Sequence, residues 1–265
     1  MPATETLYLW PDGNPNDYQK DRPRIERYEP KEKSDKPAPC VLVCPGGGYG
    51  GRAGHEGAPF AELFAANGFA SFVCHYRVSP NRHPAPMTDV CRAIRIIRSR
   101  AKEWNIDDHR IALMGFSAGG HLASTVATQP NLHVDKNDDL AEKFPARPDR
   151  VILGYPVITM SSPKTHGGSV NNLLGPNATD EMKKQMSNEL QVTKENPPAF
   201  IFHTWDDGAV PVDNALLFAS ACAKAGVKSE LHIYETGRHG VGMASNDPRL
   251  KSWTELLLNW LKAWK

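Results

Sequence analysis

The segment of this chain best suited to chemistry is Gly115-Phe116-Ser117-Ala118-Gly119. An apolar run that predicts a buried strand precedes it, and a pattern typical of a helix follows it. A serine on a sharp turn between a strand and a helix presents its hydroxyl at the edge of a sheet, and flanking glycines allow the close approach. We therefore predict that Ser117 is a nucleophile. The alternative is a tight loop that carries a bystander serine.

A serine hydroxyl needs a base within hydrogen-bond reach, and the base needs a carboxylate to orient it. On a doubly wound sheet the chain order of such groups is serine, acid, histidine. Only His232 and His239 lie late enough in the chain to follow an acid placed after the penultimate strand. His232 falls inside an alternating strand pattern, whereas His239 lies just past it between glycines. We predict His239 as the general base.

The orienting acid should follow the apolar run over residues 199–202. Asp206 and Asp207 both lie on that loop, and their positions do not choose between them. Asp213 precedes a helical pattern and is better explained as a favourable charge at a helix N-terminus. The acid is therefore Asp206 or Asp207.

Negative charge that develops on a substrate carbonyl requires backbone N–H donors. The residue after the nucleophile, Ala118, should supply one of them. The glycine-rich loop 45–51 follows an apolar run and should supply the others, since glycine lets the backbone turn its amides toward a substrate. No Lys-Ser/Thr pair follows these glycines, and they match no dinucleotide fingerprint, so a phosphate-binding loop is the weaker interpretation.

The elements that must position these residues alternate along the chain. Apolar runs predict buried strands, and a last segment alternates as a strand near a sheet edge does; they cover 40–44, 69–74, 110–114, 151–153, 199–202 and 230–234. Apolar residues repeat at helical spacing over 57–67, 87–104, 118–128, 213–225 and 249–263. This alternation predicts an α/β fold with a mostly parallel central sheet and helices on both faces.

Two segments depart from this rhythm. Residues 1–39 are polar and proline-rich, with Leu7–Trp10 and Arg24–Tyr28 as strands of a possible edge hairpin. Residues 156–198 hold a glycine-rich loop and a charged helix near 179–190, and we interpret them as a small lid-like insertion over the active-site edge. We expect residues 1–265 to form a single domain.

The amino-acid composition limits the classes of partner and the compartment that we expect for this protein. The 265 residues carry 31 basic and 30 acidic side chains, for a net charge of +1, which favours neither nucleic acid nor a membrane surface. The odd count of 5 cysteines, without a Cys-x-x-Cys pair, predicts buried free thiols. The N-terminus has no basic or apolar leader pattern, so we expect a cytoplasmic protein, or a secreted or periplasmic one if a signal peptide has been removed.

With these residues identified, the chain resembles the α/β-hydrolase superfamily of serine esterases. More narrowly, it resembles the capless acetylxylan and feruloyl esterases and related acetyl esterases of carbohydrate breakdown. The resemblance spans most of the chain from about Leu9 onward and rests on Leu9-Trp10-Pro11-Asp12-Gly13, Cys44-Pro45-Gly46-Gly47-Gly48-Tyr49, Gly115–Leu122, Gly167-Gly168-Ser169, Asn172-Leu173-Leu174-Gly175, His203-Thr204-Trp205-Asp206-Asp207, Val210-Pro211 and His239-Gly240.

The resemblance implies roles for particular residues. The family's acid lies three positions before Val-Pro, which is Asp207 here, and its oxyanion donors correspond to Gly47, Gly48 and Ala118. The chain departs from lipase-like relatives at Pro45, where they carry histidine, and at Thr204-Trp205, which replace a glycine-containing step. We expect four residues to bind substrate: Tyr49, Arg52, His55 and Trp205.

The function predicted from the sequence is that of a serine carboxylesterase that hydrolyses short acyl esters, acetyl above all, on carbohydrate such as acetylated xylan oligosaccharides. The mechanism requires no cofactor and no metal. Three alternatives remain: a prolyl-oligopeptidase-like peptidase, for whose extra domain this chain has no room; a feruloyl or general carboxylesterase; and an inactive binding module on the same fold.

Overall fold

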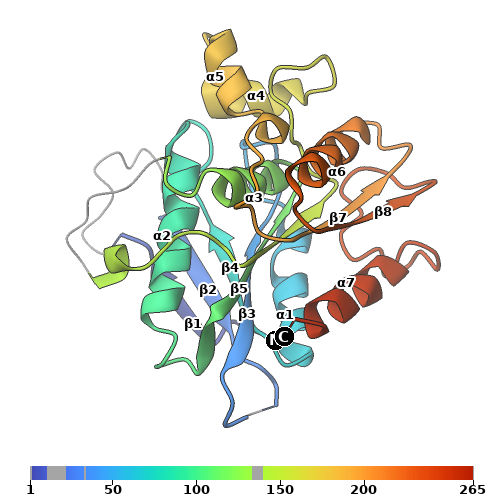
Figure 1. Ribbon diagram of the computed structural model, residues 1–265. Coiled ribbons are helices and arrows are strands. Elements are labelled where there is room, and N and C mark those ends of the chain that lie inside the picture. The colour runs from blue at the N-terminus through green and yellow to red at the C-terminus, as the bar shows by residue number, and fades with distance from the viewer. Residues whose placement is uncertain (1, 11–21, 33, 133–139, 265) are drawn as a thin grey trace.

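The computed structural model describes residues 2–10, 22–32, 34–132 and 140–264. Its strands form one 8-stranded sheet in the order β1-β2-β4-β3-β5-β6-β7-β8, with helices packed against it (Figure 1). The strands are β1 (Glu5–Tyr8), β2 (Arg24–Tyr28), β3 (Ala38–Cys44), β4 (Ala70–His75), β5 (Ile106–Phe116), β6 (Arg150–Gly154), β7 (Ala199–Thr204) and β8 (Ser229–Tyr234). The α-helices are α1 (Ala58–Ala66), α2 (Ala85–Ser99), α3 (Ala118–Thr128), α4 (Gly167–Leu174), α5 (Asp180–Gln185), α6 (Asp213–Ala225) and α7 (Ser252–Lys262).

The sheet is mostly parallel, as the alternating pattern predicts. Strands β3 to β8 run parallel to one another, while β1 and β2 add an antiparallel edge next to β4. The first strand begins at Glu5, two residues before the apolar Leu7 that suggested it. The motif residues Pro11, Asp12 and Gly13 lie outside the described residues. The α/β fold class is confirmed.

The two faces of the sheet carry the two larger of three separate apolar clusters. Along β3, Leu42 packs into one core, while Val41 and Val43 pack into the other, because successive side chains of a strand point to opposite faces. Helices α2, α3 and α6 contribute to the first core, and α1 and α7 to the second. Figure 1 shows these two helix layers on either side of the sheet.

The strand order places two predicted functional loops side by side. The chain leaves β3 toward β4 on one side and continues from β5 toward β8 on the other, so β3 and β5 flank the topological switch point. Cys44 at the end of β3 pairs with Gly115 near the end of β5. The glycine-rich loop and Ser117 therefore start from neighbouring strand ends, where ligands bind in open α/β sheets.

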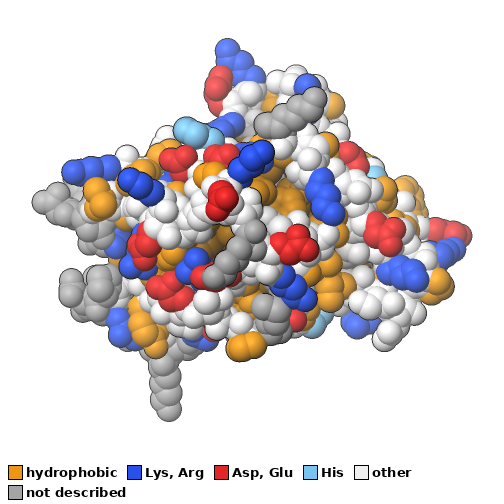
Figure 2. Space-filling model, turned by 90° about the horizontal axis from the view of Figure 1, so that it is seen from below, with side chains coloured by type: hydrophobic (Ala, Val, Ile, Leu, Met, Phe, Trp, Pro, Cys, Tyr) orange, Lys and Arg blue, Asp and Glu red, His pale blue; other side chains and the backbone are white. Residues whose placement is uncertain are grey.

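Residues 155–198, between β6 and β7, contain α4, α5 and a short 3₁₀ helix, Asn188–Leu190. The charged helix expected near 179–190 is thus divided between α5 and this 3₁₀ turn. Helices α4 and α5 lie together at one end of the molecule, beyond α3 and α6 (Figure 1). On the face seen in Figure 2, basic and acidic side chains are interspersed and form no patch of one sign.

Candidate active site

Ser117 lies on a strained turn between β5 and α3. Its φ of 51° and ψ of −119° fall outside the regions that L-residues favour, as a nucleophile on a sharp elbow requires. A Cβ at Gly115 would overlap the carbonyl of Gly119, and one at Gly119 would overlap the carbonyl of Cys44. Only glycine at these two positions lets the strand, the turn and the helix approach so closely.

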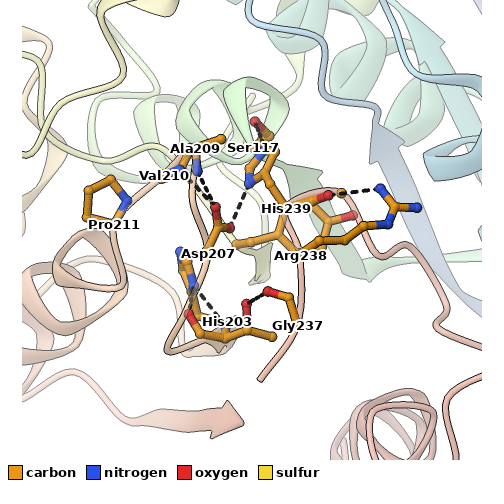
Figure 3. A network of polar contacts seen from close by, with 12 residues as sticks. Ser117, His203, Asp207, Ala209, Val210, Pro211, Gly237, Arg238 and His239 are labelled. Atoms are coloured by element: carbon orange, nitrogen blue, oxygen red, sulfur yellow. Dashed lines mark hydrogen bonds and ion pairs between the residues drawn. The ribbon is translucent and has the colours of Figure 1, made fainter. Parts of the chain in front are cut away.

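The structure brings three residues from distant parts of the chain into one hydrogen-bonded line. The Nε2 atom of His239 lies 2.8 Å from Ser117 Oγ, and its Nδ1 lies 2.7 Å from Asp207 Oδ2. Figure 3 shows this line running from the loop after β7, through His239, to the elbow. Because an ionised carboxylate only accepts, Nδ1 donates to Asp207 and Nε2 accepts the serine proton.

The structure also separates the two aspartates, whose positions on the loop left the acid open and of which the family resemblance implied Asp207. The Oδ1 atom of Asp207 accepts hydrogen bonds from the amides of Ala209 and Val210, both at 2.9 Å. Burial alone would raise the pKa of Asp207, but the hydrogen bonds from His239 and these amides outweigh it and lower the pKa below its usual value. The carboxylate thus stays ionised.

The neighbouring carboxylate has a different partner. Asp206 is exposed, and its Oδ1 accepts a 2.6 Å hydrogen bond from the amide of Gly237. It therefore braces the loop that carries His239 without contacting the imidazole. The other candidate base, His232, bonds Glu230 on its own strand β8, with 2.7 Å between Nε2 and Oε1. His232 is not part of the site.

Hydrogen bonds hold the glycine-rich loop with its amides turned in one direction. The carbonyl of Gly46 accepts from the amide of Ala53 at 2.8 Å, and that of Gly47 accepts from Gly50 and Gly51 at 3.0 and 3.1 Å. In a trans peptide the N–H points opposite to the carbonyl. The N–H groups of Gly47 and Gly48 therefore face away from these partners.

These amides are available for a substrate oxygen. Within the described chain, neither these two N–H groups nor that of Ala118 donates a hydrogen bond to a protein acceptor. The loop also lies against the elbow, since a Cβ at Gly46 would be 2.9 Å from Ser117 Cβ. This arrangement has the donors that a developing oxyanion needs.

A buried carboxylate beneath the site was not anticipated from the sequence. Glu56 is 2% exposed, and its Oε2 accepts from the Gly46 amide at 2.7 Å while its Oε1 accepts from the Tyr155 hydroxyl at 2.7 Å. The same hydroxyl accepts from the amide of Gly242 at 3.1 Å. Glu56 and Tyr155 thereby join the glycine-rich loop to the histidine loop.

Tyr155 also contacts the predicted base directly. Its ring packs edge-on against the imidazole of His239, with 5.1 Å between the ring centroids. Burial, with the neighbouring Glu56 carboxylate, raises the pKa of Tyr155 well above its usual value, so the hydroxyl keeps its proton. The only sequence signal for this network is an acidic residue beside apolar helix positions.

Two of the four residues expected to bind substrate are engaged inside the protein. The ring of Tyr49 is 1% exposed, and its hydroxyl lies 2.7 Å from Nδ1 of His121, behind the elbow. Its side chain has no surface to offer a substrate, so that part of the prediction is withdrawn. Arg52 is half-buried and donates from Nη1 to the carbonyl of Tyr76 at 2.6 Å.

The other two lie on the surface near the triad. His55 is exposed, with Nε2 at 3.0 Å from the carbonyl of Gly240, next to His239. Trp205 is 62% exposed and lies two residues before Asp207, and its amide donates to Tyr234 in β8. Substrate binding by Arg52, His55 and Trp205 stays a prediction.

Helix α4 of the insertion docks on the glycine-rich loop. The Asn172 side chain donates to the carbonyl of Gly48 at 2.9 Å. His166, at the N-cap of α4, reaches the same loop: its Cε1 would lie 3.7 Å from a Cβ at Gly48. Both residues lie in or beside motifs that carried the family resemblance, but no sequence pattern assigned either of them a role at the site.

The fold and this arrangement of side chains define the class of protein as an α/β-hydrolase with the site of a serine esterase. A model of the BD-FAE family matches residues 25–222, and the chain belongs to that family. The family relationship predicted from the motifs is thereby confirmed.

Relatives and solved structures agree with this assignment. Endo-1,4-beta-xylanase B of Butyrivibrio fibrisolvens is 40% identical over 219 residues, which cover 81% of this chain and 34% of that protein. Acetylxylan esterase of Xylanibacter ruminicola is 36% identical over 229 residues, which cover 84% of this chain and 45% of that protein. The chain thus spans less than half the length of these two curated relatives.

A crystal structure matches over nearly the full length of both chains. The acetyl ester-xyloside bifunctional hydrolase from Caldicellulosiruptor lactoaceticus superposes with a TM-score of 0.91 at 43% identity, covering 98% of this chain and 96% of that one. The carboxylesterase Cest-2923 from Lactobacillus plantarum superposes with a TM-score of 0.78 at 26% identity.

Proposed function

We propose that this protein is a serine carboxylesterase that removes short acyl groups, acetyl above all, from carbohydrate such as acetylated xylan oligosaccharides. The observation that carries the proposal is the line of hydrogen bonds from Asp207 through His239 to Ser117, at 2.7 and 2.8 Å. The carbohydrate class is supported by the relatives named for acetylxylan ester and xyloside hydrolysis.

The mechanism follows from the geometry. Ser117 Oγ attacks the ester carbonyl carbon while His239 Nε2 takes the serine proton, and Asp207 stabilises the imidazolium. The amides of Gly47, Gly48 and Ala118 bind the oxyanion. His239 then protonates the departing alcohol, and a water that it deprotonates hydrolyses the acyl-enzyme.

We further propose a single domain in which residues 156–198 act as a lid-like insertion beside the site. The one sheet that both apolar cores share supports this division, as does the contact between Asn172 and the Gly48 carbonyl. No helix in the described part of the chain is long and apolar enough to cross a bilayer. The balanced charge supports a small-molecule or oligosaccharide ester as partner, without nucleic acid or membrane.

The test is a panel of p-nitrophenyl esters and acetylated xylo-oligosaccharides, with the unmodified protein and Ser117→Ala. We expect acetate release that the substitution lowers at least about 10³-fold, and labelling of Ser117 by a serine-directed phosphonate. Equal rates from both proteins would remove the mechanism. Cleavage of dipeptidyl amides without acetate release would favour a peptidase instead.

A further inference from the structure

His166 presents an unused hydrogen-bond donor at the edge of the glycine-rich loop. Its Nδ1 caps α4 by accepting from the Ser169 amide at 3.2 Å, with the Ser169 hydroxyl at 2.9 Å. A nitrogen that accepts from a backbone amide carries no proton, so the neutral ring must carry its proton on Nε2. Of the residues described, none accepts a hydrogen bond from that Nε2.

The imidazole of His166 lies beside the oxyanion loop. His166 Cε1 is the nearest atom to a Cβ built at Gly48, at 3.7 Å, and nothing else described lies within 4 Å. Nε2 is bonded to this Cε1 and so also lies close to the loop, while Nδ1, on the other side of Cε1, is taken up by Ser169. His166 is partly exposed, and the Asn172 bond to the Gly48 carbonyl holds α4 at this position.

His239 and Asp207 of the triad influence the pKa of His166. Partial burial and the nearby His239 lower the pKa of His166, while Asp207 opposes them, so the ring stays neutral near pH 7. A neutral imidazole next to the oxyanion loop donates a directed hydrogen bond without placing a second cation beside the imidazolium that forms during the reaction.

We propose that the Nε2–H of His166 donates a hydrogen bond to an oxygen of the sugar whose ester is bound at Ser117, and thereby selects carbohydrate esters over simple ones. This rests on the proposed esterase function. An acetyl group offers only its carbonyl oxygen as an acceptor, and the loop amides already bind that oxygen. The acceptors left near the site are therefore the hydroxyl and ring oxygens of the sugar that carries the ester. His166 is a specificity-determining residue that takes no proton in the reaction.

Two substitutions separate the donor from the helix cap. In His166→Asn the side-chain oxygen can take the place of Nδ1 and keep the cap, but no donor reaches the position of Nε2. In His166→Gln the longer amide can place an N–H near that position, whereas the cap is lost. The measured quantity is the ratio of kcat/KM for acetylated xylobiose to kcat/KM for p-nitrophenyl acetate.

We expect His166→Asn to lower this ratio about tenfold, the value of one hydrogen bond, mainly through KM. His166→Gln should keep the ratio within about threefold of the unmodified protein. An unchanged ratio in His166→Asn overturns the inference, and a fall in His166→Gln alone would show that the cap matters and the donor does not. An equal fall in both variants also overturns it, because His166→Gln keeps a donor near the position of Nε2. Failure of the proposed function itself gives a different result, because the unmodified protein would then release no acetate from either substrate.

Discussion

The sharpest test of the site concerns the two adjacent aspartates. In Asp207→Asn the amides of Ala209 and Val210 still require an acceptor, and each lies 2.9 Å from Oδ1. The asparagine oxygen must therefore occupy that position, which turns its NH₂ group toward Nδ1 of His239. An NH₂ donor there requires an unprotonated Nδ1, and the neutral imidazole then carries its proton on Nε2.

This tautomer cannot accept the proton of Ser117, although every heavy atom keeps its place. A wrong tautomer in such a triad costs about 10³- to 10⁴-fold in kcat, which corresponds to about 4–5.5 kcal/mol of activation free energy. The matched control is Asp206→Asn. Its side chain is exposed and accepts one bond, from the Gly237 amide at 2.6 Å, which an asparagine oxygen can also accept.

The assay is kcat on p-nitrophenyl acetate at pH 8 for both variants, with circular dichroism to verify folding. We expect a loss of about 10³-fold or more for Asp207→Asn and of less than about threefold for Asp206→Asn. Equal losses in the two variants, or a folded Asp207→Asn protein with more than about a tenth of the original rate, would refute the tautomer argument.

Two further predictions concern the groups beneath the site. Glu56→Ala leaves the Gly46 amide and the Tyr155 hydroxyl without their acceptor. It should lower the free energy of unfolding by about 2–4 kcal/mol in urea titrations, and lower kcat as well. Unchanged stability would contradict the bridging role of Glu56. Burial lowers the pKa of His121 to about 4, so the unfolded chain binds this proton first as pH falls below about 6.5. The free energy of unfolding should therefore fall between about pH 6.5 and pH 4, with about 2 kcal/mol lost by pH 5. His121→Gln should remove this part of the pH dependence, measured by urea titrations at each pH. Equal slopes of the unfolding free energy against pH in both proteins would argue against this role of His121.

Much of the fold could be predicted from the sequence because it depends on local patterns. The apolar run over 199–202 and the helical spacing over 213–225 predicted β7 and α6 with errors of no more than two residues at the ends. The predicted and observed ends of an element differ by more residues where its sequence is polar. The strand β5 begins at Ile106, four residues before the apolar run starts, because Ile106 to Arg110 extend the strand with few apolar side chains to signal it.

The site was predictable where a residue type and its local neighbours determine its geometry. Ser117 needs an elbow, and the glycines that allow one adjoin it in the chain. Tyr49 was expected to bind substrate, but its side chain is buried. A φ of 59° and the buried hydroxyl of the pair with His121 turn its ring inward instead.

By itself, the sequence determined the order of strands and helices, the elbow at Ser117 and the placement of His239 on a loop past the last strand, since each depends on nearby residues. Local spacing left Asp206 and Asp207 open, and the family resemblance implied Asp207. Only the tertiary structure shows the Asp207 contact with His239, the bridge through Glu56 and the place of His166 beside Gly48. These contacts join residues from separate strands and loops, and whether such groups meet depends on how the sheet, the loops and the insertion pack. One-dimensional spacing carries no information about that packing.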